Sequence, residues 1–184
     1  MPTDTTLHAA TLALLTAWQP PTPRQAAARD RYVAHLLQRP DGMTRGCYPD
    51  HLTASTLVVS ADRSQVLLTL HRKARQWFQL GGHCEPQDTS IGGAALREAV
   101  EESGLPGLVL DPQPVQLSEH AVPFCDPRGG VSHLDVRFVA VAPAGAVPAV
   151  SVESLDVAWW PARELPDPQP DMVELVEFAL ARLG

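Results

Sequence analysis

The sequence has few of the features that stabilise or target a secreted protein. Its three cysteines, Cys47, Cys84 and Cys125, are an odd number without CxxC spacing, which excludes a disulfide framework and a zinc ribbon. The first residues, MPTDTTLHAA, lack the basic segment of a signal peptide. The longest weakly polar run, 138–150, is short and interrupted by two prolines, so no segment is expected to cross a membrane. We therefore expect reduced thiols and a cytoplasmic location.

The sequence is also short of basic residues. It has 14 Lys and Arg, of which Lys73 is the only lysine, against 21 Asp and Glu, and the formal net charge is −7. This balance argues against a nucleic acid partner, because binding to phosphates along a strand requires clustered basic side chains. A length of 184 residues and a hydrophobic content of 45% predict one globular domain with a modest extension.

Eighteen prolines separate the segments of regular hydrophobic spacing. Helical spacing predicts a first helix from about Asp4 or Thr5 to Trp18, which the following prolines end. A second helix is expected from Pro23, with Thr22 as its N-cap, to just before Pro40. We expect these helices to form an N-terminal extension over 1–45, and the main domain to span 46–184.

The rest of the chain predicts a mixed order of α and β elements. Segments 52–60 and 65–70 are expected to form a hairpin, and 90–103 a helix. Strands are expected at 115–122, 134–141 and 157–160. Asp171 is the expected cap of a last helix whose core-facing residues are Met172, Leu175, Val176, Ala179 and Leu183.

The segment from Gly81 to Leu105 is the most informative, because a glycine turn leads through a polar loop into an acidic helix. Glu98, Glu101 and Glu102 share about 100° of that helix circumference. Like charges at these spacings, near a helix C-terminus, destabilise the helix. A divalent cation such as Mg²⁺ or Mn²⁺ removes the repulsion, since it prefers carboxylate oxygens.

A solvated acidic surface, partly neutralised by Arg97, is the alternative interpretation. The context favours a metal site, because Gly104 is suited to a left-handed C-terminal cap and the helix has a compact apolar side for packing on a sheet. That apolar side consists of Ala94, Ala95, Ala99 and Val100.

This segment resembles the signature of the Nudix hydrolases, G-x5-E-x7-R-E-U-x-E-E-x-G-U, in which U is bulky and apolar. The residues that match in type and spacing are Gly81, Gly82, Glu85, Arg97, Glu98, Glu101, Glu102, Gly104 and Leu105. Asp88 stands where the family has Glu and lies nine residues before Arg97 rather than eight. Ala99 is also small for its position. Together with flanking segments, the resemblance covers roughly 48–165 and is to a MutT-like, bacterial branch without an assigned substrate.

The resemblance implies a Nudix-like α/β/α sandwich (α/β or α+β) with a mixed sheet, extended by the two N-terminal helices. It implies metal-dependent hydrolysis of a pyrophosphate bond in a nucleoside diphosphate linked to another moiety. The catalytic metal ions, Mg²⁺ or Mn²⁺, are then held by Glu98, Glu102 and the carbonyl of Gly81. Glu101 joins them or orients water, and Asp88 pairs with Arg97 to brace the loop.

Other residues are candidates for supporting roles. Glu119 and Glu153 are both candidates for a general base outside the signature. Phosphate binding is expected from Gly82 and from a basic cluster just before it, for which a solvated hairpin end is the alternative. The cluster consists of His71, Arg72, Lys73 and Arg75.

Four further side chains, His83, His120, His133 and Asp135, allow two interpretations. They suggest a zinc site, but alternation along 133–137 is also typical of one polar face of a strand, and this second interpretation is favoured. Of the aromatic pairs 77–78 and 159–160, at least one member each is expected in the core. Cys84 is interpreted as a small packing residue.

Two other functions remain open on the same fold. An isopentenyl-diphosphate isomerase-like enzyme requires a Cys and Glu pair, and no corresponding cysteine motif is present. A non-catalytic nucleotide-sensing module usually has a damaged glutamate cluster, whereas this cluster is complete. The expected partner is a small nucleoside diphosphate derivative, and a homodimer is possible.

Overall fold

The computed structural model describes residues 5–123, 125–150 and 154–184, which form four helices and eight strands. The helices are α1 (Thr5–Ala17), α2 (Pro23–Gln38), α3 (Ile91–Ser103) and α4 (Pro170–Leu183). The strands are β1 (Asp50–Val59), β2 (Gln65–His71), β3 (Trp77–Phe78), β4 (Leu80–His83), β5 (Val109–Leu110), β6 (Gln116–Ala121), β7 (Ser132–Val141) and β8 (Ser154–Pro161).

All eight strands belong to one mixed, curled sheet with β1 and β7 at its centre. These two strands run parallel over ten residue pairs, from Asp50 opposite Ser132 to Val59 opposite Val141. The other pairings are antiparallel, and β1 also pairs with both β2 and β4. The hairpin, the helices and the longer strands expected from the sequence are therefore confirmed.

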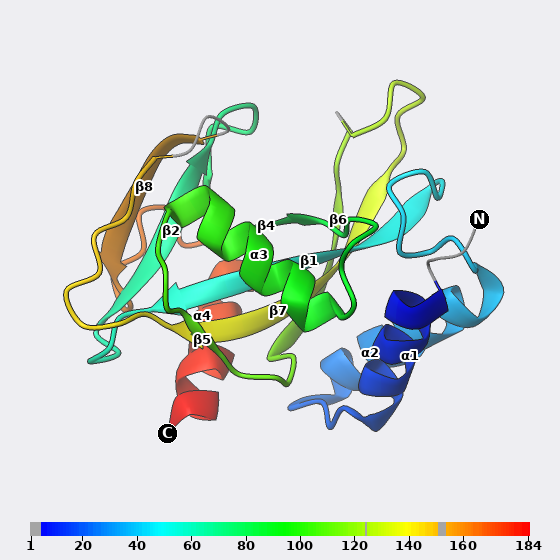
Figure 1. Ribbon diagram of the computed structural model, residues 1–184, viewed down its shortest axis with the longest axis horizontal. Coiled ribbons are helices and arrows are strands. Elements are labelled where there is room, and N and C mark those ends of the chain that lie inside the picture. Colours follow the sequence, from blue (N-terminus) through cyan, green and yellow to red (C-terminus); the bar gives the residue numbers. More distant parts are fainter. Residues whose placement is uncertain (1–4, 124, 151–153) are drawn as a thin grey trace.

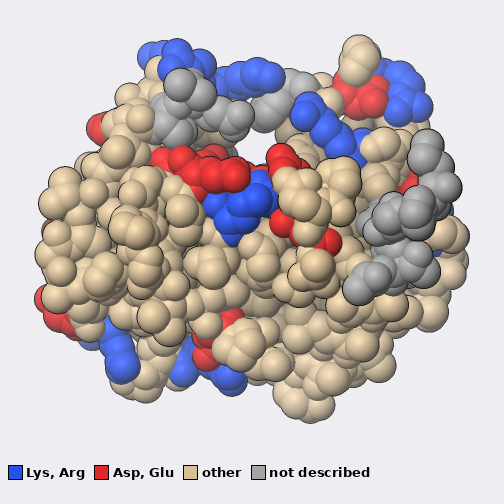
Figure 2. Space-filling model, in the orientation of Figure 1, with Lys and Arg blue, Asp and Glu red and all other residues tan. Residues whose placement is uncertain are grey.

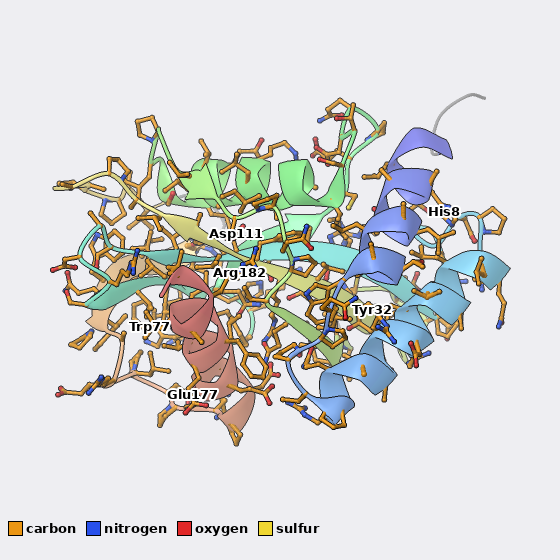
Figure 3. The ribbon with its side chains drawn as sticks, turned by 90° about the horizontal axis from the view of Figure 1, so that it is seen from below. His8, Tyr32, Trp77, Asp111, Glu177 and Arg182 are labelled. Atoms are coloured by element: carbon orange, nitrogen blue, oxygen red, sulfur yellow. The ribbon has the colours of Figure 1, made fainter. Side chains whose placement is uncertain are left out.

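Helices α3 and α4 cover opposite faces of the sheet, and α1 and α2 lie together at one end (Figures 1 and 3). Alternation along β1 separates the two faces, because successive side chains of a strand point to opposite sides. Leu52 and Ala54 pack with α3, whereas Leu57 and Val59 pack with α4. The expected α/β/α arrangement is confirmed.

Local sequence signals set the helix ends. The Thr22 hydroxyl accepts a hydrogen bond from the Gln25 N–H, and Pro23 occupies the first turn of α2. Ser90 caps α3 in the same way, through the Gly93 N–H at 3.1 Å. Gly104 ends α3 with a φ of 66°, a conformation that glycine adopts at little cost.

The N-terminal helices share a continuous core with the sheet. Trp18, directly after α1, and Tyr32 and Leu36 of α2 are buried in the same cluster as Leu134 and residues of α3. His8 on α1 lies with its Nε2 atom 3.0 Å from the carbonyl oxygen of Leu36, at the C-terminal end of α2 (Figure 3). Both helices are thus positioned by the main fold, while the division at residues 45 and 46 stays a prediction.

Two expectations about local structure are wrong, and three short strands were missed. Asp171 is not the cap of α4, because Gln169 precedes Pro170 at that position and the Asp171 carboxylate instead accepts a hydrogen bond from Arg137. Val100 is exposed rather than in the core of α3. Strands β3, β4 and β5 were not expected, since segments of two to four residues are too short to show a period.

The aromatic pairs split as expected. Trp77 and Trp160 meet edge to face, 5.3 Å between ring centroids, on the core that α4 covers. Trp159 lies on the core beneath α3, and its Nε1–H donates to the Ala146 carbonyl. None of the helices among the described residues is long and apolar enough to span a bilayer.

The shared core predicts that α2 is required for stability. Leu36 is 1% exposed, so Leu36→Ala should lower the free energy of unfolding by about 2–5 kcal/mol through lost contacts and a cavity. Leu37, the next residue, is 68% exposed, and Leu37→Ala should change it by less than about 0.5 kcal/mol. Urea unfolding measures both, and equal effects would show that α2 does not share the core.

Candidate active site

Strand β4 is the element that brings the site together. Gly81 and Gly82, expected in a turn, are instead extended and pair with Ser55 and Ala54 of β1. A Cβ at Gly81 would lie 2.3 Å from the Ser55 Cβ, and one at Gly82 would lie 2.7 Å from the Glu98 Cδ. The glycines therefore allow β1, β4 and α3 to approach one another more closely than any side chain permits.

Two carboxylates of α3 converge on these glycines. Glu98 packs directly against Gly82, and the Gly81 N–H donates to Glu102 Oε2 at 3.1 Å. The two residues are one helical turn apart, so their side chains point the same way. Glu101 is more exposed, at 58% of its side chain, and lies beside them.

Arg97 links the carboxylates to the loop before α3. Its guanidinium binds Asp88 through two hydrogen bonds of 2.9 and 3.2 Å, so the contact implied by the family resemblance is present despite the extra residue. It also donates to Glu98, Glu101 and the carbonyl oxygen of His83. Burial is the largest single influence and raises the pKa of Asp88, but the hydrogen bonds from Arg97 and from the Glu85 N–H, together with the charge of Arg97, outweigh it, so the net shift is downward.

Acidic and basic side chains gather over α3 (Figure 2). The basic cluster begins at His71, the last residue of β2, and continues through the turn to β3. Arg72 donates to the carbonyl oxygen of Ser154 at 3.2 Å, which ties this turn to β8. Arg75 has a φ of 58°, so the turn there is tight.

The candidate bases outside the signature are placed differently. Glu119, on β6, accepts hydrogen bonds of 2.6 and 2.7 Å from Arg31 of α2, and this pairing lowers its pKa. Glu119 thus belongs to the contact between the N-terminal helices and the sheet. Glu153 lies outside the described residues.

A buried polar network crosses the sheet face opposite α3. Asp135 on β7 accepts hydrogen bonds from Thr53 and Ser55 of β1 and from Arg137, whose side chain is 5% exposed. Arg137 also donates to Asp171 of α4. The alternation along 133–137 is therefore a polar strand face, as favoured from the sequence.

At the end of this face, three imidazoles and one thiol lie together. They belong to His51, His83, His133 and Cys125, whose ligand atoms all lie within 4.8 Å of one another. Two of the residues weighed for zinc from the sequence, His83 and His133, are in this cluster. His120 and Asp135 are not, although the His120 ring lies 5.7 Å from that of His133.

Sequence reasoning missed His51 and Cys125, which are separated by 74 residues and share no spacing pattern. The only signal was that each histidine lies near the start or end of a strand. The three cysteines are free thiols, as expected, and Cys84 packs partly buried against the core beneath α3.

Comparison with known proteins agrees with this geometry. The model of the NUDIX domain matches residues 49–178, which include all of α3, β4 and the loop between them. The chain belongs to the Nudix family. This confirms the resemblance, the fold class and the expected enzyme class, a Nudix-type pyrophosphohydrolase. Among curated proteins, none matches the chain.

Solved structures of Nudix proteins share the fold. A NUDIX-family hydrolase from Clostridium perfringens is 25% identical, with a TM-score of 0.58 over 73% of this chain and 98% of that one. A C. elegans Ap4A hydrolase, in a binary complex, is 16% identical, with a TM-score of 0.62 over 72% and 96%. The NUDIX domain of Shewanella oneidensis NrtR, complexed with ADP ribose, is 24% identical, with a TM-score of 0.54 over 72% and 88%.

The Asp88–Arg97 contact predicts a stability difference that depends on pH. A carboxyl whose pKa is lowered by folding stabilises the fold above its unfolded pKa and loses that contribution as the pH falls through its folded pKa. Asp88→Asn should therefore lower the free energy of unfolding by about 1–3 kcal/mol at pH 7. The difference from the parent protein should shrink below about pH 4.

Asp30→Asn is the matched control, because Asp30 pairs with Arg29 at a site where its side chain is 70% exposed. Its effect should stay below about 1 kcal/mol at every pH. Urea unfolding at a series of pH values measures both variants. If Asp88→Asn lowers the free energy of unfolding by the same amount at every pH, then the shape of the Asp88 side chain, and not its charge, stabilises the loop before α3.

Proposed function

We propose that this Nudix protein hydrolyses a pyrophosphate bond in a nucleoside diphosphate linked to another moiety, in a reaction that depends on Mg²⁺ or Mn²⁺. One observation carries the proposal. The Glu98 and Glu102 carboxylates converge on the Gly81–Gly82 segment of β4. Both belong to α3, a helix that is capped at both ends. Geometry of this kind holds charged groups rigidly enough to act on a phosphoric anhydride.

The donor set suits a hard divalent cation, and Nudix hydrolases generally use divalent metal ions. Glu98 and Glu102 offer carboxylate oxygens, the carbonyl oxygen of Gly81 is a further candidate ligand, and Glu101 is the outer member of the group. When bound there, such an ion neutralises phosphate oxygens and lowers the pKa of water.

Arg97 and Asp88 serve to position the catalytic carboxylates. The Arg97 guanidinium touches Glu98 and Glu101, so it limits the repulsion among the acidic residues and fixes their direction. Asp88 holds Arg97 from the other side. In this assignment Glu98, Glu101 and Glu102 act on the substrate through bound metal, and the ion pair keeps them in place.

The diphosphate is expected to meet the basic turn between β2 and β3. His71, Arg72 and Arg75 offer positive or hydrogen-bonding groups there, and Gly82, which lies directly against the Glu98 carboxylate, is a further candidate contact. The Ap4A hydrolase and the ADP-ribose complex among the similar structures support a nucleotide derivative as the substrate class. A cytoplasmic location and a homodimer stay predictions.

Substrate is tested by incubating the protein with a panel of compounds and Mg²⁺, Mn²⁺ or a chelator, and by separating the cleaved nucleotides and phosphomonoesters by chromatography. The panel contains nucleoside triphosphates, nucleotide sugars, ADP-ribose, dinucleoside polyphosphates and isopentenyl diphosphate. Chelator-sensitive cleavage of one nucleotide class supports the hydrolase and identifies that class. Isomerisation of isopentenyl diphosphate would support the isomerase, and nucleotide binding without turnover would support a sensor.

Substitution of the two convergent carboxylates tests the site itself. Glu98→Gln and Glu102→Gln should each lower kcat roughly 100-fold or more, because an amide removes the charge that stabilises the transition state through metal. Circular dichroism and thermal unfolding should show that both variants fold. Glu177→Gln, on the exposed side of α4 across the sheet, is the control and should keep the parent rate (Figure 3). Parent rates in both site variants would refute the assignment.

A further inference from the structure

We propose that His51, His83, His133 and Cys125 form a second metal site that holds one Zn²⁺ ion with four protein ligands. The four residues come from β1, β4, β7 and the loop after β6. None of them belongs to the acidic cluster of α3, and the proposal does not depend on the hydrolase activity.

The spacing of the ligand atoms fits a tetrahedral ion. Ligands at the usual Zn–N and Zn–S distances lie about 3.3–3.6 Å from one another at the corners of a tetrahedron. The Nε2 atoms of His51 and His83 are 3.1 Å apart. The Cys125 Sγ atom lies 3.4, 3.6 and 3.9 Å from the Nε2 atoms of His133, His83 and His51.

Strand register explains why the imidazoles meet. His51 lies directly opposite His133 in the parallel β1–β7 pair, so both rings leave the same face of the sheet. His83 lies opposite Thr53, which is two residues from His51 and therefore on that face as well. The three ring centroids are 4.9–5.1 Å apart. The sheet thus places three nitrogen ligands without help from a flexible segment.

The surroundings prepare the rings for metal binding. His51 Nδ1 lies 3.1 Å from the carbonyl oxygen of Cys47, and donation there leaves the Nε2 lone pair directed into the cluster. His83 and His133 are half-buried with ring centroids 4.9 Å apart, so their surroundings disfavour the charged form of both rings. Neutral imidazole is the form that binds metal.

Alternation along β4 separates this site from the acidic cluster. Gly82 faces Glu98 of α3, and the next residue, His83, points to the opposite side of the strand. The ligand chemistry differs as well. Three imidazoles and a thiolate are borderline-soft ligands that select Zn²⁺, whereas carboxylate oxygens select Mg²⁺ or Mn²⁺. Each ion therefore has its own place on β4.

Four protein ligands leave no open position, which is typical of a structural zinc site. Bound zinc joins Cys125, between β6 and β7, to the centre of the sheet and to the end of β4. Arg97 donates to the carbonyl oxygen of His83 and also to Glu98 and Glu101 of the acidic cluster. It therefore connects the backbone of a proposed zinc ligand to the acidic site. Zinc should therefore stabilise the hairpin of β6 and β7 and the start of the loop that leads from β4 to α3.

The test measures metal content and the spectrum of the full chain. Protein stripped with a chelator and dialysed should take up one Zn²⁺ per chain by mass spectrometry of metals. Co²⁺ in its place should give the intense visible bands of a tetrahedral ion and a thiolate charge-transfer band in the near ultraviolet. Cys125→Ser should abolish the charge-transfer band, and His83→Ala should weaken zinc binding by more than about 100-fold.

Matched controls separate this site from its surroundings. His120→Ala and Cys84→Ser remove an imidazole and a thiol near the cluster but outside it, and both should keep the cobalt spectrum. Glu102→Gln should also keep it, since its carboxylate belongs to the other site. The proposal fails if zinc does not bind stoichiometrically, if Cys125→Ser and His83→Ala bind it as the parent does, or if Glu102→Gln abolishes binding.

Discussion

The close approach of β4 to both β1 and α3 is the constraint on which the rest of the site depends. Gly81 lies so near Ser55, and Gly82 so near Glu98, that a Cβ at either position would overlap its neighbour. The space that a side chain would fill is occupied by the Glu98 carboxylate. The backbone N–H of Gly81 then becomes available to Glu102. Two residues without side chains thus decide where two functional side chains lie.

The acidic helix illustrates how this constraint and electrostatics act together. Three carboxylates within about one turn repel one another, and this repulsion would destabilise α3 as an isolated helix. Packing holds the helix, because Ile91, Ala94 and Ala95 are buried against the sheet. Arg97 offsets part of the repulsion by bonding to two of the glutamates. The remaining negative potential is available for a cation, so local destabilisation and function have the same origin.

Sequence reasoning predicted the long elements well and the short ones poorly. Helices α2 and α3 have strong end signals in Thr22, Pro23 and Gly104, and β1 and β7 have long hydrophobic runs. Strand β4 consists of LGGH, in which two glycines are typical of a turn. Only its pairing with β1, a tertiary interaction, makes it a strand.

The same limit applies to the candidate sites. The carboxylates of α3 were found because they lie on one helix, where a fixed period converts spacing into direction. The imidazole and thiol cluster was missed in part, because its members come from four segments and meet only through sheet register. The His51–His133 pairing depends on β1 and β7 being parallel neighbours. No spacing within the sequence specifies such a pairing.

Strand β4 has two faces with opposite chemistry, and this arrangement has a physical consequence. Hard oxygen ligands lie on the side of α3, and nitrogen and sulfur ligands lie on the other side, so each set disfavours the ion that suits the other. A closed set of four ligands resists loss of its ion, whereas a site for catalysis must leave positions for water and phosphate. Because β4 is held by register to β1 and by Glu102 to α3, rigidity on one side limits movement on the other. The geometry of the acidic site therefore depends on how firmly the far face of the same strand is held.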